Sequence, residues 1–495
     1  MDLGTDNKEL KLFQPSDIMK ARYAALSHCW GQNQPLRTTK STISVYTQSI
    51  DWNALPVVFQ DAITVARRLD LRYIWIDSPC IVQDDPDDWA AESVKMGRIY
   101  SNAYIVIAAS QSRDGADSFL APRRPIRTPL ELSLALPGAS PRKILARPII
   151  VTGLSNEYLD SRAWTYQEQR LATRLLRYTS GEMVFQCRTR WYRCECGSSH
   201  KAVTTRELYQ MALFGRYCEP IDSSHPADYI FRQWQGMVST YSMRSLTRES
   251  DRLPAMSGIA DLVQNATKSR YLAGLWVDNL MEDLCWSVEP KTAVCADEDL
   301  AITGFLSHRA SSEYRAPTFS WSSINVGVIS YELNHHPALD PVAVVLDAKC
   351  DLKKEANPLG EVTSGFLTLE AYLVQAELST PTRRLSEVMG SYELRREGME
   401  TYMRADLPIV DTIGLLEDGS QTDALGRATG QDEVHPIVGS VLCLALGYSD
   451  TDIVGLVLGR SGKVPGAYER LGKMVYGGAD WFDRGEVRHS VITIV

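Results

Sequence analysis

The chain has 495 residues, of which 44% are hydrophobic and 23% are charged, so it is long enough to bury two or more hydrophobic cores. Its 52 basic and 61 acidic residues give a formal net charge of -9. Nucleic-acid binding uses clustered Lys and Arg, so this balance argues against a nucleic-acid partner.

The N-terminal segment, MDLGTDNKELK, is polar and lacks the apolar stretch of a secretion signal. Nowhere do 18 consecutive apolar residues occur, so no membrane span is expected. The ten cysteines have no framework spacing, which is typical of a reducing compartment. We therefore expect a cytoplasmic protein.

Strand and helix patterns alternate over the first 110 residues. Apolar strand-like runs at 23–31, 72–77 and 104–110 are separated by two helical patterns. The first helix is expected over 57–70 and the second after Asp87 and Asp88. Short connections between alternating elements predict a parallel sheet with right-handed crossovers.

The two helical patterns each predict one buried face. In the first, Pro56 stands at the entry, and the inward side chains are Phe59, Ala62, Ile63, Ala66 and Leu69. In the second, Asp87 and Asp88 are expected to cap the helix, and the inward side chains are Trp89, Met96, Ile99 and Tyr100.

Polar side chains follow the first two predicted strands, where a parallel sheet binds its ligands. The first strand ends in Ser27, His28, Cys29 and Trp30. The second ends in Asp77, Ser78 and Cys80 and leads into Gln83, Asp84 and Asp85. We expect these side chains to border a pocket.

The segment SRAWTYQEQRLATR, 161–174, places Trp164 and Glu168 four residues apart. Residues at this spacing share one helix face, so Trp164 could wall an apolar slot that receives the Glu168 carboxylate. The alternative is a local ion pair of Glu168 with Arg162, Arg170 or Arg174.

Four blocks together resemble the fungal heterokaryon incompatibility (HET) domain family: YAALSHCWG, WIDSPCIVQDDPDDW, MGRIYSNAYIVIAAS and SRAWTYQEQRLATR. The resemblance covers roughly residues 20–190, and DRLPAMSGIA, YLAGLW and APTFSWSSI resemble segments that often follow this domain. One departure is Pro79, where the family usually has an aliphatic residue, and this predicts a reshaped loop.

The resemblance implies an α/β fold with a TIR-like, flavodoxin-like parallel sheet. Some TIR domains cleave the glycosidic bond of NAD with a glutamate, which implies Glu168 as a catalytic residue. We predict His28 and Asp77, at the ends of the first two strands, as further catalytic residues. The predicted ligand-binding residues are Ser27, Trp30, Ser78, Cys80, Gln83 and Trp164. No cofactor is required, and NAD is the candidate substrate.

The family role is to trigger growth arrest or cell death, through NAD cleavage or through assembly with itself or a protein partner.

A second reading is an enzyme of secondary metabolism that cyclises a terpenoid or polyketide, for example by a Diels–Alder reaction. A pocket that folds a small-molecule ligand would then be walled by four tryptophans, Trp30, Trp75, Trp89 and Trp164. The alternative is that these tryptophans simply belong to the core.

Other constellations favour ordinary structural roles. His28 with Cys29 or Cys80 could form a thiol–imidazole pair, but free cysteines are more often simply buried. Cys187, Cys194, Cys196 and His200 lack a standard zinc spacing, so no metal is expected. His335 and His336 are expected in a solvated loop. The chain has no dinucleotide fingerprint, P-loop or H-E-x-x-H motif.

The second half changes character. We expect a HET domain over 20–190, a helical connecting region over 191–300 with Trp234, Met237 and Tyr241 in its core, and a mostly antiparallel β-rich region over 301–495. In the last region, strands are expected at 366–374, 436–448, 452–461, 468–476 and 490–495. Residues 376–435 are expected to be irregular, with a mobile loop near 415–435.

Overall fold

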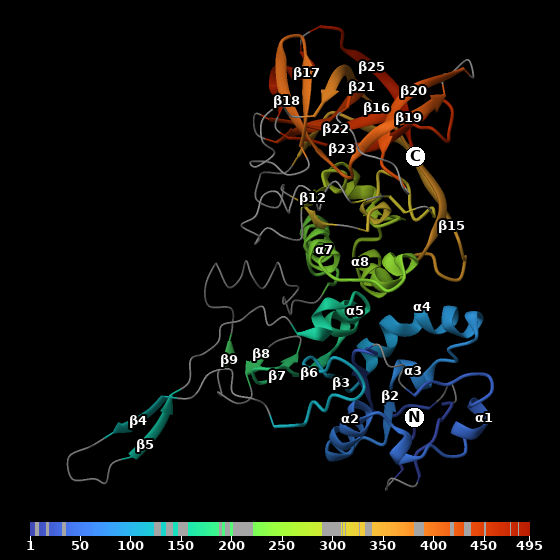
Figure 1. Ribbon diagram of the computed structural model, residues 1–495, viewed down its shortest axis with the longest axis vertical. Coiled ribbons are helices and arrows are strands. Elements are labelled where there is room, and N and C mark those ends of the chain that lie inside the picture. The colour runs from blue at the N-terminus through green and yellow to red at the C-terminus, as the bar shows by residue number, and fades with distance from the viewer. Residues whose placement is uncertain are drawn as a thin grey trace. The chain divides into compact units, whose positions relative to one another are not determined.

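The computed structural model divides the chain into two compact units, Met1–Pro220 and Ile221–Val495 (Figure 1). The residues it describes are 1–4, 9–15, 19–31, 36–122, 130–134, 142–146, 157–187, 191–193, 199–200, 221–289, 308, 310–311, 313–325, 327–331, 339–380, 391–415, 420–429, 437–449, 452–475, 477–483 and 485–495. The predicted boundaries near 190 and 300 remain predictions.

The first unit is built on a sheet in the order β2-β1-β3-β6-β7-β8-β9. The strands β1 (Tyr23–Ser27), β2 (Tyr73–Trp75), β3 (Ile105–Ala108) and β6 (Arg174–Tyr178) are parallel. The order 2-1-3-4 is that of flavodoxin-like doubly wound sheets. The predicted parallel α/β sheet is therefore confirmed.

The sheet continues beyond β6 with antiparallel strands, which are β7 (Met183–Cys187), β8 (Trp191–Arg193) and β9 (Ser199–His200). A separate hairpin pairs β4 (Leu130–Leu134) with β5 (Arg142–Ala146). The short helices of this unit are α1 (Ile43–Tyr46), η1 (Trp52–Ala54), α3 (Asp77–Cys80) and η2 (Tyr158–Ser161).

The helix α2 (Val57–Arg68) packs its apolar side chains on one face of the sheet, against β1, β2 and β3. Pro56 is its N-cap, where a missing N–H is tolerated. Four of the five predicted inward residues are buried, but Leu69 is exposed because the helix ends at Arg68 and Leu69 is its C-cap. That part of the prediction is wrong.

The helix α4 (Pro86–Asn102) contributes Met96 and Tyr100 to a second apolar cluster with Ala25, Val106 and Ala108. Its N-cap is Asp85, whose side chain accepts a hydrogen bond from the N–H of Asp87. Asp87 and Asp88 lie in the first turn, so the prediction of their favourable charge is confirmed and the prediction that they cap the helix is wrong.

The helical part of the second unit surrounds a group of buried tryptophans. Its elements are α7 (Ala227–Ser242), η3 (Glu249–Arg252), η4 (Pro254–Met256), α8 (Ser257–Thr267), η5 (Val277–Asn279), α9 (Leu280–Asp283), η6 (Trp321–Ser323) and the short strand pairs β10 (Tyr271–Leu272) with β11 (Leu275–Trp276) and β12 (Ser287–Glu289) with β13 (Val328–Ser330). Trp234, Met237 and Tyr241 are buried, as predicted.

Gly274 connects β10 with β11 and has φ of +98°. Its carbonyl accepts hydrogen bonds from Nε1 of Trp234 and of Trp321, at 3.0 and 2.9 Å. A Cβ atom there would lie 2.7 Å from Nε1 of Trp321, so both the conformation and the close approach require glycine.

The rest of the second unit is a mostly antiparallel sheet, as predicted. Its strands are β14 (Asp340–Pro341), β15 (Val344–Leu352), β16 (Val362–Ser379), β17 (Ser391–Arg396), β18 (Met399–Ala405), β21 (Val438–Ser449), β22 (Asp452–Arg460), β23 (Tyr468–Val475), β24 (Gly477–Gly478) and β25 (Arg488–Ile494). The short helix η8 (Ala479–Phe482) lies between β24 and β25. A two-stranded sheet pairs β19 (Ile409–Leu415) with β20 (Gln421–Arg427). Each of the five strands expected in this region is present.

The expectation of irregular structure over 376–435 is wrong for five stretches, which form the end of β16 and the strands β17, β18, β19 and β20. The strand β20 lies inside the predicted mobile loop. Its residues are polar and glycine-containing, but their backbone groups pair with β19, a tertiary contribution that outweighs local propensity.

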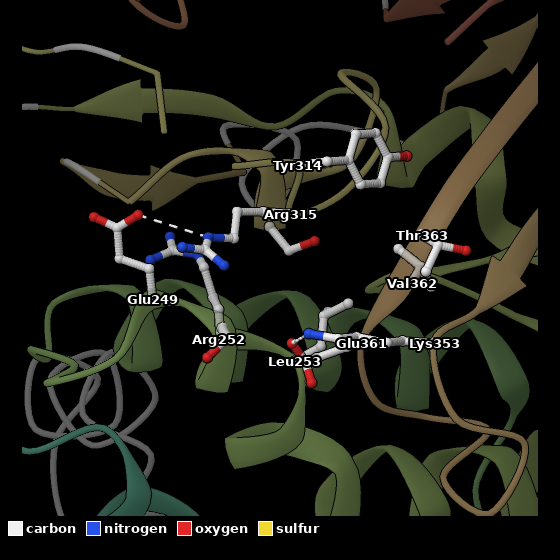
Figure 2. Close-up of a pocket in the computed structure, with 11 residues that line it drawn as sticks. Glu249, Arg252, Leu253, Tyr314, Arg315, Lys353, Glu361, Val362 and Thr363 are labelled. Carbon is white, nitrogen blue, oxygen red and sulfur yellow. Dashed lines mark hydrogen bonds and ion pairs between the residues drawn. The ribbon is translucent and has the colours of Figure 1, made fainter. Parts of the chain in front are cut away.

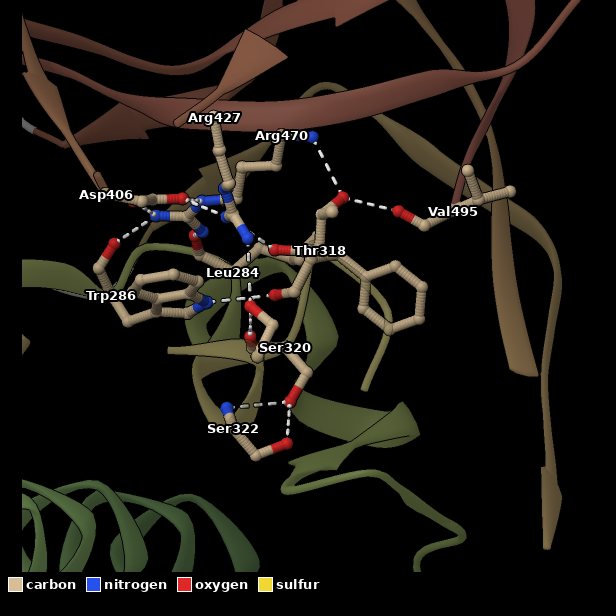
Figure 3. A network of polar contacts seen from close by, with 11 residues as sticks. Leu284, Trp286, Thr318, Ser320, Ser322, Asp406, Arg427, Arg470 and Val495 are labelled. Atoms are coloured by element: carbon tan, nitrogen blue, oxygen red, sulfur yellow. Dashed lines mark hydrogen bonds and ion pairs between the residues drawn. The ribbon is translucent and has the colours of Figure 1, made fainter. Parts of the chain in front are cut away.

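A buried polar network ties the sheet of the second unit to its helical part (Figure 3). Asp406 accepts hydrogen bonds from Nε of Arg470 at 2.9 Å and from Nη2 of Arg427 at 2.5 Å. Arg470 also donates to the carbonyls of Leu284 and Trp286. The three charged side chains are buried, so the network compensates charges that would otherwise be costly.

Across the helices that the structure describes, no segment combines the length and apolar character needed to cross a lipid bilayer.

Candidate functional site

The predicted site residues of the first unit follow the carboxyl ends of β1 and β2 or lie on the helix that packs against β1 and β3. In the sheet, β2 is the neighbour of β1 on one edge and β3 is its neighbour on the other edge. The direction in which successive strands are added therefore reverses between β1 and β3. Ser27 pairs in register with Ala108 at this point. In doubly wound sheets such a switch point is where ligands bind.

The helix α5 (Trp164–Leu171) is held at this edge by the turn before it. The N–H of Leu159 donates to the carbonyl of Ser110, which follows β3. Asp160 forms a 2.6 Å ion pair with Arg177 of β6. Thr165 Oγ1 donates to the Leu159 carbonyl at 2.7 Å and so joins the first turn of α5 to that segment.

Glu168 is buried in α5, with 5% of its surface exposed. Burial raises the pKa of its carboxyl group to about 7, and the negative charge of Asp77 acts in the same direction. The hydroxyls of Ser27 and Tyr100 and the positive charge of Arg162 lower that pKa, so all four groups lie near the carboxylate. The fold thus brings Glu168 near Ser27 at the end of β1 and near Asp77, which follows β2.

Asp77 is the first residue of α3 and is the most accessible of the charged site residues, with 22% of its side chain exposed. Its Oδ2 accepts a 2.8 Å hydrogen bond from Nε1 of Trp30, and its Oδ1 accepts one of 2.7 Å from the N–H of Ser78. Nδ1 of His28 lies 3.8 Å from Oδ1 of Asp77.

His28 is buried against Phe59, with the two ring centroids 5.1 Å apart. Burial lowers the pKa of its imidazole. The negative charge of Asp77 raises that pKa, and the positive charge of Arg162 lowers it further. The imidazole is therefore neutral at pH 7. Its Nε2 has no hydrogen-bond partner in the described part of the chain, which leaves one buried polar atom available to a ligand.

Several predicted ligand-binding residues are engaged within the protein. The Ser78 hydroxyl donates to the carbonyl of Leu36 at 2.9 Å. Gln83 Nε2 donates to the carbonyls of Asp77 and Ile81, at 3.2 and 3.1 Å. These two side chains hold the loop after β2 and have these donors already in use.

Ser27 and Trp164 complete the predicted ligand-binding set. Ser27 is fully buried beside Glu168, although its Oγ makes no well-aligned hydrogen bond to another described residue. The Trp164 ring meets that of Trp89 edge to face at a centroid distance of 6.4 Å, and the Trp75 ring meets Tyr100 at 5.5 Å. These rings fill the space beside α4, and a pocket for cyclisation walled by tryptophans stays a prediction.

The two cysteines near the site lie in different surroundings. Cys29 packs in the cluster that contains Met96 and Tyr100, and burial raises the pKa of its thiol to about 11. Cys80 packs against the cluster that contains α2, with its Sγ 3.8 Å from the N-terminal amine. A thiol with a raised pKa carries little thiolate at neutral pH, so Cys29 is a poor nucleophile.

Pro79 occupies the first turn of α3, where its missing N–H leaves no hydrogen bond unmade. Its carbonyl accepts a 2.6 Å hydrogen bond from Thr38 Oγ1. Within the described ranges, no group of three or more His, Cys, Asp or Glu side chains is placed to hold a metal ion. Cys194 and Cys196 of the sequence motif, and the pair His335 and His336, lie outside the described residues.

Two neighbours of Glu168 were not predicted as site residues. Tyr100 was expected only as an inward residue of its helix, and its hydroxyl donates to the carbonyl of Leu26 at 3.0 Å. Arg162 was named only as a local ion-pair partner. Helical periodicity placed Tyr100 on the correct face of α4, but no sequence signal indicates which side chain of α5 it meets.

Residues 23–168 match the family model described as Heterokaryon incompatibility protein (HET). The first unit contains a HET domain. The match begins at the first residue of β1 and ends at Glu168, so the HET domain includes the parallel strands β1, β2 and β3 and the carboxylate beside them. The resemblance predicted from the four sequence blocks is confirmed. A comparison with curated proteins and one with solved structures each gave no match.

Proposed function

We propose that this protein of the heterokaryon-incompatibility type arrests growth by hydrolysing the N-glycosidic bond of NAD, with Glu168 as the catalytic carboxylate. The observation that supports the proposal is the position of Glu168, buried at the switch point between β1 and β3 with a pKa of about 7. A carboxyl group of this pKa is about half ionised at neutral pH, where a general base works best.

In the proposed reaction, the bond between nicotinamide and the ribose carbon breaks, and nicotinamide leaves with the bonding electron pair. The ribosyl group becomes an oxocarbenium-like cation, which the Glu168 carboxylate stabilises. Glu168 then accepts a proton from the attacking water, which forms the new C–O bond. The products are ADP-ribose, nicotinamide and one proton, so water is the only co-reactant.

Neighbouring groups have distinct parts in this proposal. Asp77 raises the pKa of Glu168 by its charge, and the Ser27 and Tyr100 hydroxyls lie near the carboxylate and lower that pKa. The unpartnered Nε2 of neutral His28 offers a hydrogen-bonding group to the ribose or its phosphate. Because Glu168 is 5% exposed, substrate entry requires side chains on the more exposed Trp30 and Asp77 side to move.

The test is nicotinamide release from NAD by the purified full-length protein, followed by chromatography. We expect release by the wild type and its loss in Glu168→Gln. The matched control is Glu92→Gln on α4, whose carboxylate pairs with Lys95 at 2.7 Å and which should leave the rate unchanged. Circular dichroism checks that each variant is folded. No release by folded wild type at micromolar enzyme, or full activity in Glu168→Gln, would overturn the proposal.

Expression in yeast tests the cellular role. We expect slow growth and a lowered NAD pool with the wild type, and normal growth with Glu168→Gln at an equal protein level. Slow growth that persists in Glu168→Gln with an unchanged NAD pool would contradict the hydrolase and point to assembly.

A further inference from the structure

The second unit contains a cavity of about 170 Å³, separate from the HET domain (Figure 2). It lies between η3, the segment around η6 and the turn that joins β15 to β16. Its lining residues are Glu249, Ser250, Arg252, Leu253, Tyr314, Arg315, Ser322, Lys353, Glu361, Val362 and Thr363. The volume holds several water molecules or a small ion and is smaller than a typical drug-sized pocket, which is about 300–1,000 Å³.

Arg252 is the unusual member of this lining because it is buried, with 6% of its surface exposed, and lacks an anionic partner at ion-pair distance among the described residues. Its guanidinium carbon lies 5.5 Å from the centroid of the Trp321 ring. Its backbone is anchored by the Tyr241 hydroxyl, which donates to the Arg252 carbonyl at 2.8 Å. A buried guanidinium remains charged and normally requires a partner.

The two unpartnered atoms of Arg252 are Nε and Nη2. They form one edge of the guanidinium fork, which can donate two parallel hydrogen bonds to one carboxylate or phosphate. Arg72 in the first unit uses this same edge on Asp2, with Nε and Nη2 each 3.0 Å from a carboxylate oxygen. In Arg252 this edge is unused by the described chain.

The other charges of the lining are mostly compensated. Arg315 forms a 3.0 Å ion pair with Glu313 and lies 3.7 Å from Glu249. Lys353 forms a 2.8 Å ion pair with Glu361 at the more exposed part of the cavity. Figure 2 shows Arg252, Arg315 and Glu249 gathered at one end and Lys353 with Glu361 at the other. The lining holds three cationic and two anionic side chains, and Glu313 beside it supplies a third negative charge, so Arg252 is the cation left without an ion-pair partner among the described residues.

We propose that this cavity binds a small oxyanion, either a phosphate or a carboxylate group, on the Nε–Nη2 edge of Arg252. The Ser250 hydroxyl lines the same cavity and can donate a further hydrogen bond, whereas the Thr363 hydroxyl already donates to the carbonyl of Asp351 at 3.3 Å. The unpartnered edge of the Arg252 guanidinium favours an anion over a neutral ligand. The oxyanion is either a free ion or the charged end of a small metabolite, because the cavity is too small for a dinucleotide.

The test is titration of the full-length protein with inorganic phosphate, acetate and glycerol 3-phosphate by isothermal calorimetry, in a chloride buffer of constant ionic strength. We expect saturable 1:1 binding of at least one of these anions. Tightest binding of inorganic phosphate identifies a free ion, tightest binding of glycerol 3-phosphate identifies an organic phosphate, and tightest binding of acetate identifies a carboxylate.

Two variants and a control locate the site. Arg252→Lys keeps the charge but removes the two-donor edge, and we expect at least tenfold weaker binding. Thr363→Trp fills the cavity from an exposed lining position and should also abolish binding, which keeps the test informative if Arg252→Lys does not fold. The control is Arg248→Lys, an exposed residue next to η3 that is outside the lining and should bind as the wild type does. The proposal is overturned if none of the three anions binds saturably at concentrations up to about 10 mM, an order-of-magnitude upper limit for a specific site. It is also overturned if a folded Arg252→Lys or Thr363→Trp variant binds as the wild type does.

Discussion

Trp30 Nε1 donates a 2.8 Å hydrogen bond to Oδ2 of Asp77, which joins the segment after β1 to the first residue of α3. The Asp77 side chain is 22% exposed, whereas Glu168 is buried. The negative charge of Asp77 raises the pKa of Glu168, so an accessible carboxylate influences the protonation of an inaccessible one. Ionisation of Glu168 should therefore be measurable as a change in stability.

Glu168→Gln should stabilise the protein at pH 8 and have little effect at pH 5. The pKa of Glu168 is raised from 4.5 to about 7, so between these values the folded state binds more protons than the unfolded state. Stability then falls as pH rises through this window, by at most roughly 3 kcal/mol. The glutamine side chain of the variant carries no charge and escapes this penalty. Thermal unfolding of both proteins across pH 5–8 measures the difference, and an equal difference at both ends would contradict the raised pKa.

Asp77→Asn should move the ionisation of Glu168 to lower pH. Asp77 is the second cause of the raised pKa after burial, and its removal leaves burial as the main one. The measurement compares Asp77→Asn with the double variant Asp77→Asn, Glu168→Gln across the same pH range. The pH at which their stabilities diverge should lie below that of the wild-type pair. An unchanged midpoint would show that the two carboxylates do not interact.

Asp406→Ala should destabilise the second unit by about 3–5 kcal/mol, because it leaves the buried guanidinium groups of Arg470 and Arg427 without their carboxylate. The control is Asp351→Ala, which breaks a 2.7 Å pair with Lys349 in which both side chains are exposed. That change should cost little stability, because solvent screens the attraction between exposed charges. Urea unfolding measures both, and similar losses in the two variants would mean that burial of the network adds nothing.

Cys29→Ala should leave nicotinamide release intact if the carboxylate mechanism is correct. The Cys29 thiol is buried and its pKa is raised to about 11, so it carries almost no thiolate at pH 7. Alkylation of Cys29 by iodoacetamide in the folded protein should likewise be far slower than in urea, as measured by mass spectrometry of the labelled peptides. Loss of release in a folded Cys29→Ala variant would revive the thiol mechanism.

Local sequence patterns predicted most of the HET domain correctly. Alternation of apolar runs with helical spacings located β1, α2, β2, α4 and β3, because each element buries a face that its own period defines. Errors lie at element ends. The first strand ends at Ser27 rather than at residue 31, and Asp77 begins a helix instead of ending a strand. At the second of these ends the N–H of Cys80 donates to the carbonyl of Ile76 in a helical turn, which periodicity does not reveal.

The β-rich region shows where local patterns are insufficient. Apolar runs such as 452–461 were recognised as strands because both faces of β22 are buried. The strands β17 and β18 were missed because charged residues interrupt their apolar positions. Arg396 illustrates the reason: it is buried, and its Nη1 donates a 2.8 Å hydrogen bond to the carbonyl of Trp481, which lies 85 residues away. A strand that relies on such distant partners has no local signature.

The sequence by itself determined the family of the first unit, its parallel α/β sheet and the residues at the ends of β1 and β2. Those follow from short motifs and from the periods of helix and strand, which act over a few residues. Only the tertiary structure decided that Glu168 is buried beside Asp77, Ser27 and Tyr100, and that Arg252 faces a cavity without a partner among the described residues. Burial and charge compensation depend on segments far apart in the chain, so the chemistry of both sites becomes visible only once the chain has folded.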